Sequence, residues 1–248
     1  MLDNQIIIVT GAAKGMGEAH ARHLASKGAH VVMTDVDSIG VETAEDIRKK
    51  GASAEFHRLD VVDEAGWQQL TAAVVERHGR IDGLVNNAGI LVRKPVDELS
   101  GDDWDLLFNV NVKGSFLGCK HVLPGMQRAG GGSIVNISSI SGMVANMPGM
   151  SAYCATKGAI RLFTKGLAVD YARHNIRANS VHPGTIRTPM TAEYEHDSDK
   201  LRMLLGTTIL GRLGEAKEVS EVVAFLLSGS ASFITGAELM VDGGFTAV

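Results

Sequence analysis

The sequence lacks an excess of basic charge, contains little cysteine and has no long hydrophobic run. With 24 Lys and Arg against 28 Asp and Glu, its formal net charge is −4, which offers no basic field for nucleic acid. The two cysteines, Cys119 and Cys154, indicate reduced thiols in a cytoplasmic protein. The first apolar run is too short for a signal peptide or a membrane span, so we expect no membrane partner.

No Pro/Ser-rich linker or charge block divides the 248 residues. A chain of this size buries about 70% of the surface that its unfolded form exposes, which is enough for one hydrophobic core without stabilising disulfides or metal ions. Short β-branched runs alternate with helical stretches, and this alternation predicts an α/β fold with a parallel sheet. Strands are expected at 5–10, 30–35, 54–61, 83–89, 132–139, 176–184 and 236–244, and helices at 18–27, 41–50, 64–78, 103–127, 155–173 and 216–227.

One long segment, at about 185–214, interrupts this alternation. Excursions of this length in a compact domain are usually lids or functional loops. The segment is rich in Met and Leu, and methionine adapts to irregular apolar shapes. We therefore expect it to cover an apolar substrate.

A glycine-rich turn follows the first expected strand. Gly11, Gly15 and Gly17 have the spacing G-x-x-x-G-x-G, and glycines there let the backbone approach a pyrophosphate at a helix N-terminus. Asp35 ends the second strand, where a carboxylate accepts hydrogen bonds from a ribose and repels the extra phosphate of NADP. Lys14 in the turn favours NADP, but Asp35 stands where the ribose 2′ position should be. We therefore expect NAD as the cofactor.

Tyr153 and Lys157 stand four residues apart in a stretch that reads as helical. Residues with this spacing share a helix face, with Cβ atoms about 5–6 Å apart. At an effective dielectric constant of about 20, unit charges 4 Å apart interact by roughly 4 kcal/mol. The spacing predicts that Lys157 lowers the pKa of Tyr153 from about 10 toward about 7, where the phenol can exchange a proton.

Together these motifs resemble the short-chain dehydrogenase/reductase family over essentially the whole chain. The turn Thr10–Gly17 matches its T-G-x-x-x-G-x-G pattern, and Asn86-Asn87-Ala88-Gly89 matches its N-N-A-G strand end. The other matching positions are Asn111 in NVNVKG, Ser139, Tyr153 and Lys157, His182-Pro183-Gly184 with Thr188, and Gly236 with Asp242-Gly243-Gly244.

The resemblance implies a single Rossmann-like domain over residues 1–248, with a seven-stranded doubly wound sheet and hydride transfer between a nicotinamide and an alcohol or carbonyl. It implies Tyr153 as general acid/base, Lys157 as its neighbour on the nicotinamide ribose, and Ser139 on the substrate oxygen. Ser138 and Ser141 are alternatives to Ser139. Asn111 would hold a water that links Lys157 to solvent.

It also implies two sets of binding residues. The substrate set is Ser139, Ser141, Met147, Tyr153 and Met190. The cofactor set is Gly11, Lys14, Gly15, Met16, Gly17, Asp35, Asp60, Val61, Asn87, Ala88, Gly89, Tyr153, Lys157, Pro183, Gly184, Ile186 and Thr188.

The C-terminal third resembles cyclopentanol and cyclohexanol dehydrogenases and 3α/20β-hydroxysteroid dehydrogenases. We therefore expect an apolar secondary alcohol or its ketone as substrate. The long helices at 104–127 and 155–173 carry apolar residues beyond what one sheet face needs, and in the resembled family they pair with those of a second subunit. We therefore expect a homotetramer, with a dimer as the alternative. A 3-ketoacyl thioester reductase and a noncatalytic dinucleotide sensor remain alternatives. His20 and His23 lie three residues apart on the first helix but lack a Cys or carboxylate partner pattern, so no metal is expected.

Overall fold

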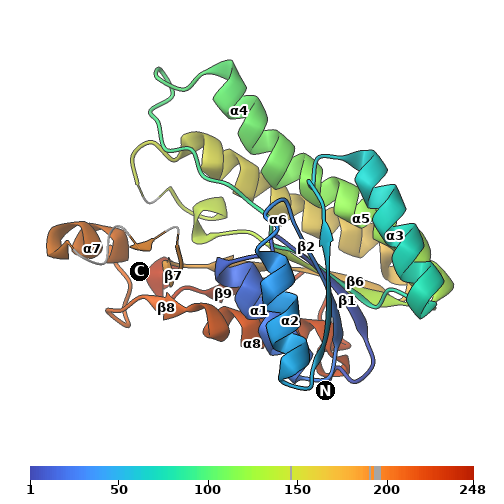
Figure 1. The fold of residues 1–248 in the computed structure, drawn as a ribbon. Helices are drawn as coiled ribbons and strands as arrows, with labels where there is room; N and C mark the ends of the chain where they lie inside the picture. The colour runs from blue at the N-terminus through green and yellow to red at the C-terminus, as the bar shows by residue number, and fades with distance from the viewer. Residues whose placement is uncertain (146, 190, 193–196) are drawn as a thin grey trace.

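The computed structural model describes residues 1–145, 147–189, 191–192 and 197–248. Within these residues, a seven-stranded parallel sheet has the order β3-β2-β1-β4-β5-β6-β9 and is covered by helices on both faces (Figure 1). The doubly wound, single-domain α/β fold is thereby confirmed. The strands are β1 Ile6–Thr10, β2 His30–Asp35, β3 Ser53–Arg58, β4 Gly83–Asn86, β5 Gly132–Ile137, β6 Ile176–Pro183 and β9 Glu238–Val241.

Alternating side chains of β1 build the two halves of the core. Ile7 and Val9 pack in the cluster that includes α1, α2 and α8, whereas Ile6 and Ile8 pack with Trp67 on the opposite face. A strand buried on both faces needs apolar residues at every position, which explains the run IIIV. The helices are α1 Gly15–Ser26, α2 Gly40–Lys49 and α8 Ala216–Leu227 on one face, and α3 Glu64–His78, α5 Gly114–Arg128 and α6 Ser151–Tyr171 on the other.

The sheet changes its winding direction between β1 and β4. β1 pairs with β2 on one side and with β4 on the other, so the connections leave the centre of the sheet in opposite directions. In doubly wound sheets the crevice at the carboxyl ends of such strands binds the ligand. The glycine turn after β1 and the Asn-Asn-Ala-Gly sequence at the end of β4 both lie at this crevice.

The helix expected at 103–127 is not continuous. α4, Gly101–Phe108, is followed by a π-helical segment, Asn109–Lys113, before α5 begins at Gly114. The Gly114 N–H donates to the Asn109 carbonyl, five residues back. Single π turns are rare and often occur at functional sites. This one carries Asn111, whose side chain is buried.

A small two-stranded sheet joins the ends of the expected lid. β7, Ile186–Arg187, pairs with β8, Gly214–Glu215. Between them lies α7, Ser198–Leu205, which projects from the rest of the fold (Figure 1). In the described part of the chain, no helix has the length and apolar character needed to cross a membrane.

Candidate active site

The glycine turn leaves no room for side chains at two of its positions. A Cβ on Gly17 would lie 1.9 Å from the Gly11 carbonyl oxygen, and a Cβ on Gly11 would lie 2.8 Å from the Ala88 Cα. Gly11 and Gly15 also have φ of +62°, which favours glycine. The backbone of β1 and the N-terminus of α1 can therefore approach a ligand closely.

Thr10 and Asn87 fasten the turn to the end of β4. The backbone N–H groups of Asn87 and Ala88 both donate to Thr10 Oγ1 at 3.0 Å. Asn87 Nδ2 donates to the carbonyls of Thr10 and Gly11, at 3.0 and 3.2 Å. Among the described residues Asn87 Oδ1 is buried and has no hydrogen-bond partner. An unpaired acceptor beside a glycine turn fits a hydrogen-bond donor on a bound ligand.

A cavity of about 560 Å³ opens over this turn. At one end Asp35 accepts hydrogen bonds from the backbone of Ala13 and Asp37, each at 3.0 Å. The Lys14 ammonium lies 3.6 Å from the Asp37 carboxylate. The expected cofactor residues that line the cavity are Gly11, Lys14, Gly15, Met16, Gly17, Asp35, Asp60, Val61, Asn87, Ala88, Gly89 and Thr188.

A second cavity, of about 550 Å³, adjoins the first. Met16, Gly89, Ile90 and Thr188 line both cavities, so the two spaces are contiguous. The second cavity also holds the expected residues Ser139, Ser141, Met147, Tyr153, Pro183, Gly184 and Ile186. Met190 lies outside the described residues.

Tyr153 and Lys157 share one face of α6, as their spacing predicts. Lys157 Nζ lies 5.6 Å from the centroid of the Tyr153 ring and donates to the Ile137 carbonyl at 3.0 Å. The Ser139 side chain lies close enough to the tyrosine to influence its pKa. Helix α6 and the end of β5 therefore bring three of the expected catalytic residues together.

The prediction that Lys157 lowers the pKa of Tyr153 is wrong for the protein without a bound ligand. Burial raises the pKa of Tyr153 to about 12, although the nearby Ser139 side chain lowers it in part. Burial also lowers the pKa of Lys157 to about 8. The reason is desolvation: both groups are buried, and the ammonium bonds to a backbone carbonyl. The four-residue spacing alone could not show this burial.

The structure separates Ser139 from its neighbour Ser138. Ser138 Oγ donates to the Lys157 carbonyl at 2.9 Å and so anchors α6 to β5. Ser139 Oγ accepts a hydrogen bond from the Ser141 N–H at 3.0 Å and faces Tyr153 in the second cavity. The sequence motif identified His182 but not its contact with this serine: its Nδ1 lies 3.0 Å from the Ser139 carbonyl.

Asn111 connects the π-helical segment to the chain after β4, at Ile90, and to helix α6, at Thr156. Its Oδ1 accepts from the Ile90 N–H at 2.8 Å, and its Nδ2 donates to the Ile90 carbonyl at 3.0 Å and to Thr156 Oγ1 at 3.1 Å. A Cβ on Gly89 would lie 3.3 Å from Asn111 Oδ1 and 3.5 Å from Lys157 Nζ. Asn111 thus lies beside the lysine with its side chain fully hydrogen-bonded. The water it is expected to hold stays a prediction.

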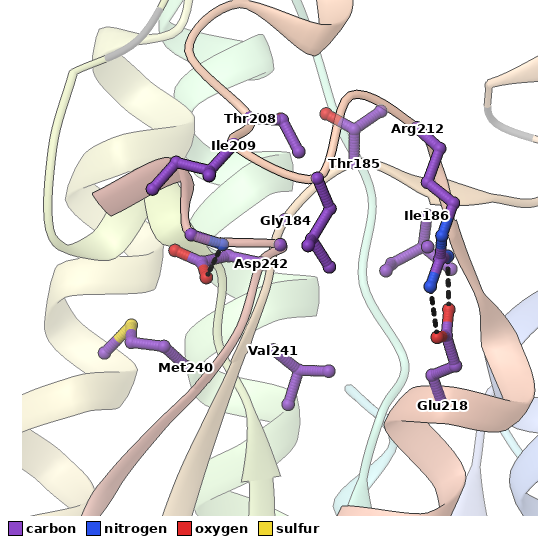
Figure 2. A pocket seen from close by; sticks show the side chains of 14 residues that line it. Gly184, Thr185, Ile186, Thr208, Ile209, Arg212, Glu218, Met240, Val241 and Asp242 are labelled. Carbon is purple, nitrogen blue, oxygen red and sulfur yellow. Dashed lines mark hydrogen bonds and ion pairs between the residues drawn. The ribbon is translucent and has the colours of Figure 1, made fainter. Parts of the chain in front are cut away.

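A third cavity, of about 430 Å³, lies behind the loop after β6 (Figure 2). It shares Gly184, Thr185 and Ile186 with the second cavity. Figure 2 shows Arg212 and Glu218 pointing toward each other, and their two hydrogen bonds measure 2.9 and 2.8 Å. This bidentate pair fixes the chain just before β8 to the start of α8.

A glycine turn at the switch point of a parallel sheet, with Ser139 and Tyr153 in an adjoining cavity and Lys157 buried behind the tyrosine, defines a dinucleotide-dependent oxidoreductase. A family model described as enoyl-(acyl carrier protein) reductase matches residues 11–246. The chain belongs to the short-chain dehydrogenase/reductase family.

Two curated relatives match almost the whole chain. Cyclopentanol dehydrogenase of Comamonas sp. is 47% identical over 247 residues, which cover 99% of this chain and 98% of the relative. The 3-alpha-(or 20-beta)-hydroxysteroid dehydrogenase of Mycobacterium bovis is 38% identical, with 99% and 91% covered. These similarities confirm the resemblance seen in the C-terminal third.

The fold also matches a crystal structure of gluconate 5-dehydrogenase from Burkholderia cenocepacia in complex with NADP and tartrate. The two share 36% identity and superpose with a TM-score of 0.95, over 100% of this chain and 97% of the other.

Proposed function

We propose that the protein is an NAD(H)-dependent dehydrogenase that interconverts an apolar, ring-bearing secondary alcohol and its ketone. The observation that carries this proposal is the continuity of the two cavities: one lies over the glycine turn, and the other holds the hydroxyls of Ser139 and Tyr153. A dinucleotide that extends through the first cavity reaches the second, where the substrate oxygen would meet both hydroxyls.

The residues present fit a dinucleotide. Gly11 and Gly17 leave backbone exposed to a pyrophosphate, and the unpaired Oδ1 of Asn87 suits a ribose hydroxyl. Pro183, Gly184, Ile186 and Thr188 line the second cavity beside Tyr153, where the carboxamide end would lie. When bound, the nicotinamide supplies or accepts the hydride.

Tyr153 and Ser139 handle the proton at the substrate oxygen. A phenol with a pKa of about 12 is protonated at neutral pH, so in ketone reduction it donates its proton to the oxygen. Ser139 holds that oxygen by a second hydrogen bond. The Lys157 ammonium, 5.6 Å from the ring centroid, stabilises the phenolate that results, and in alcohol oxidation this phenolate accepts the proton of the alcohol hydroxyl.

Charges at the far end of the first cavity support NAD over NADP. Asp35 and Asp60 line this cavity, and their carboxylates repel a 2′-phosphate. Lys14, the cation that argued for NADP, lies 3.6 Å from Asp37. Its charge is therefore already balanced within the protein.

The second cavity suits a compact apolar substrate. Most of its surface is apolar, and it combines aliphatic walls with the two hydroxyls at one place. The apolar lining residues include Ile90, Leu91, Ile140, Met147, Met150 and Leu204. The 47% identity to a cyclopentanol dehydrogenase supports a cyclic alcohol, and the 38% identity to a hydroxysteroid dehydrogenase supports a larger ring system.

An NAD-reduction screen tests the function. It sets cyclopentanol and cyclohexanol against hydroxysteroids, linear 2-alkanols and 3-hydroxyacyl thioesters, and we expect the highest kcat/KM for a cyclic alcohol. Tyr153→Phe should reduce turnover by at least about 100-fold, because the proton donor is lost, while NADH binding stays nearly unchanged. Tyr171→Phe, at the end of the same helix, is the matched control. Turnover of Tyr153→Phe within tenfold of wild type contradicts the proposal.

We further propose a cytoplasmic homotetramer. Several large apolar side chains on α4, α5 and α6 are exposed, and these helices lie together on one side of the molecule (Figure 1). They include Trp104, Leu106, Phe116, Leu162 and Val169. A second copy packed on this side would bury them. A light-scattering mass near the 26.3 kDa of one chain at micromolar concentration contradicts this assembly.

A further inference from the structure

Two histidines and a glutamate converge on the α3-covered side of the sheet, at its β3 edge. His30 begins β2, Glu55 lies in β3 and His78 ends α3. One ligand atom from each lies within 4.8 Å of the other two. We infer that these three side chains bind a divalent transition-metal ion of the zinc class.

The spacing of the donor atoms fits such an ion. Glu55 Oε1 lies 3.2 Å from His78 Nε2 and 3.6 Å from His30 Nε2. In a tetrahedral zinc site with bonds of about 2.0–2.2 Å, neighbouring ligand atoms are roughly 3.3–3.5 Å apart. Small side-chain rotations therefore bring all three atoms to bonding distance. A fourth position stays open to water, as three protein ligands leave it in many zinc sites.

Hydrogen bonds alone do not satisfy this cluster. A third imidazole, His57, places its Nε2 3.5 Å from the same Glu55 oxygen, while Arg77 bonds to the other carboxylate oxygen. One carboxylate oxygen offers about two lone-pair sites, fewer than the three imidazoles around it. Within the described residues, His30 Nε2 is buried without a hydrogen-bond partner. A cation shared by His30, Glu55 and His78 removes this mismatch.

The surroundings of His30 orient it as a ligand. Its Nδ1 lies 2.6 Å from Ser53 Oγ, and in the tautomer that donates to Ser53 the Nε2 lone pair faces Glu55. The rings of His30 and His78 lie 4.3 Å apart between centroids, as two ligands of one ion can.

The preferred ion follows from the donor set and its charge. Two imidazoles and one carboxylate suit zinc, cobalt, nickel or copper better than magnesium or calcium, which prefer oxygen. Arg77 beside Glu55 disfavours a cation, so the imidazole bonds must supply most of the affinity. Since Glu55 and His78 are only partly buried, the ion has access from solvent.

The site lies away from the candidate catalytic residues. His30 stands at the amino end of β2, whereas Asp35, at its carboxyl end, lines the dinucleotide cavity. A bound ion would join the last turn of α3 to β2 and β3. Its effect is therefore on the stability of this edge and not on the hydride-transfer step.

Calorimetry with zinc chloride tests the site on tag-free, chelator-treated protein. We expect one zinc ion per chain, and no heat from magnesium chloride under the same conditions. His78→Ala and the volume-conserving Glu55→Gln should each weaken zinc binding by at least about tenfold. His121→Ala is the matched control, because His121 Nε2 also contacts a glutamate, Glu64, at 3.3 Å but, among the described residues, belongs to no group of three such ligands.

Two further measurements complete the test. Circular dichroism should show that both variants are folded without metal. Zinc should raise the Tm of wild type by several degrees and leave the Tm of His78→Ala unchanged. Chelator treatment should leave kcat unchanged, so the result does not depend on the proposed function. No zinc binding by wild type, or equal binding by wild type and both variants, overturns the inference.

Discussion

Replacement of Asn111 by alanine probes the π segment most directly. The change deletes three hydrogen bonds, two to the backbone of Ile90 and one to Thr156 Oγ1. It also leaves the N–H and carbonyl of Ile90 without their partners in a partly buried position. Each lost hydrogen bond contributes about 0.5–1.5 kcal/mol, so we expect the free energy of unfolding to fall by about 2–4 kcal/mol.

Activity should fall together with stability. Ile90 lines both the dinucleotide cavity and the substrate cavity, so a shift of its backbone alters the join between them. Misplacement of about 1 Å can reduce a rate by about 100-fold, and we expect kcat/KM to fall by at least tenfold. Thermal and urea unfolding give the stability change, and initial rates with the preferred alcohol give the kinetic one.

Asn109→Ala is the matched control, because Asn109 lies in the same π segment but is exposed. An exposed substitution of this kind usually changes stability by less than about 0.5 kcal/mol. A loss below 1 kcal/mol for Asn111→Ala, or equal losses for both variants, refutes the reasoning.

Two further changes test the cofactor end and the α1–α8 interface. Asp35→Ala should raise the ratio of kcat/KM for NADP over NAD at least tenfold, and a wild type that already prefers NADP contradicts the assignment. His20 is fully buried against Ser220, and burial lowers its pKa from 6.5 to about 3. Because the pKa of His20 is lower in the folded than in the unfolded state, the contribution of the neutral ring to the free energy of unfolding is complete above pH 6.5. This contribution is lost as pH falls toward 3. Between pH 7 and pH 5, the free energy of unfolding measured with urea should therefore fall by about 2 kcal/mol more for wild type than for His20→Gln. Equal falls in the two proteins would show that His20 does not titrate on unfolding.

Most of the fold could be predicted because the strands are short, apolar and separated by helices of ordinary length. The seven expected strands correspond to the seven of the sheet. The interruption at 109–113 could not be predicted, since NVNVK contains neither glycine nor proline. It depends on the side chain of Asn111, whose partners, Ile90 and Thr156, lie 21 and 45 residues away.

The candidate site was predictable where the motif fixes local geometry. The spacing of Tyr153 and Lys157 placed both on one helix face, but the pKa of the tyrosine depends on how deeply the sheet and neighbouring loops bury it. The cluster of His30, Glu55 and His78 could not be predicted from the spacing of these residues in the sequence, because they are more than 20 residues apart along the chain. Only the pairing of β2 with β3, and the packing of α3 over them, brings these side chains together.

The short pairing of β7 with β8 has a consequence for how this scaffold can diversify. The Gly214 N–H donates to the Thr185 carbonyl at 2.9 Å, so the intervening chain departs and returns at neighbouring points. Exchanging that stretch for one of another length leaves the register of the central sheet untouched, because neither β6 nor β9 has to move. Under the proposed function, exchange of this segment between related enzymes at these two points should therefore transfer substrate preference, while Ser139 and Tyr153 stay in place.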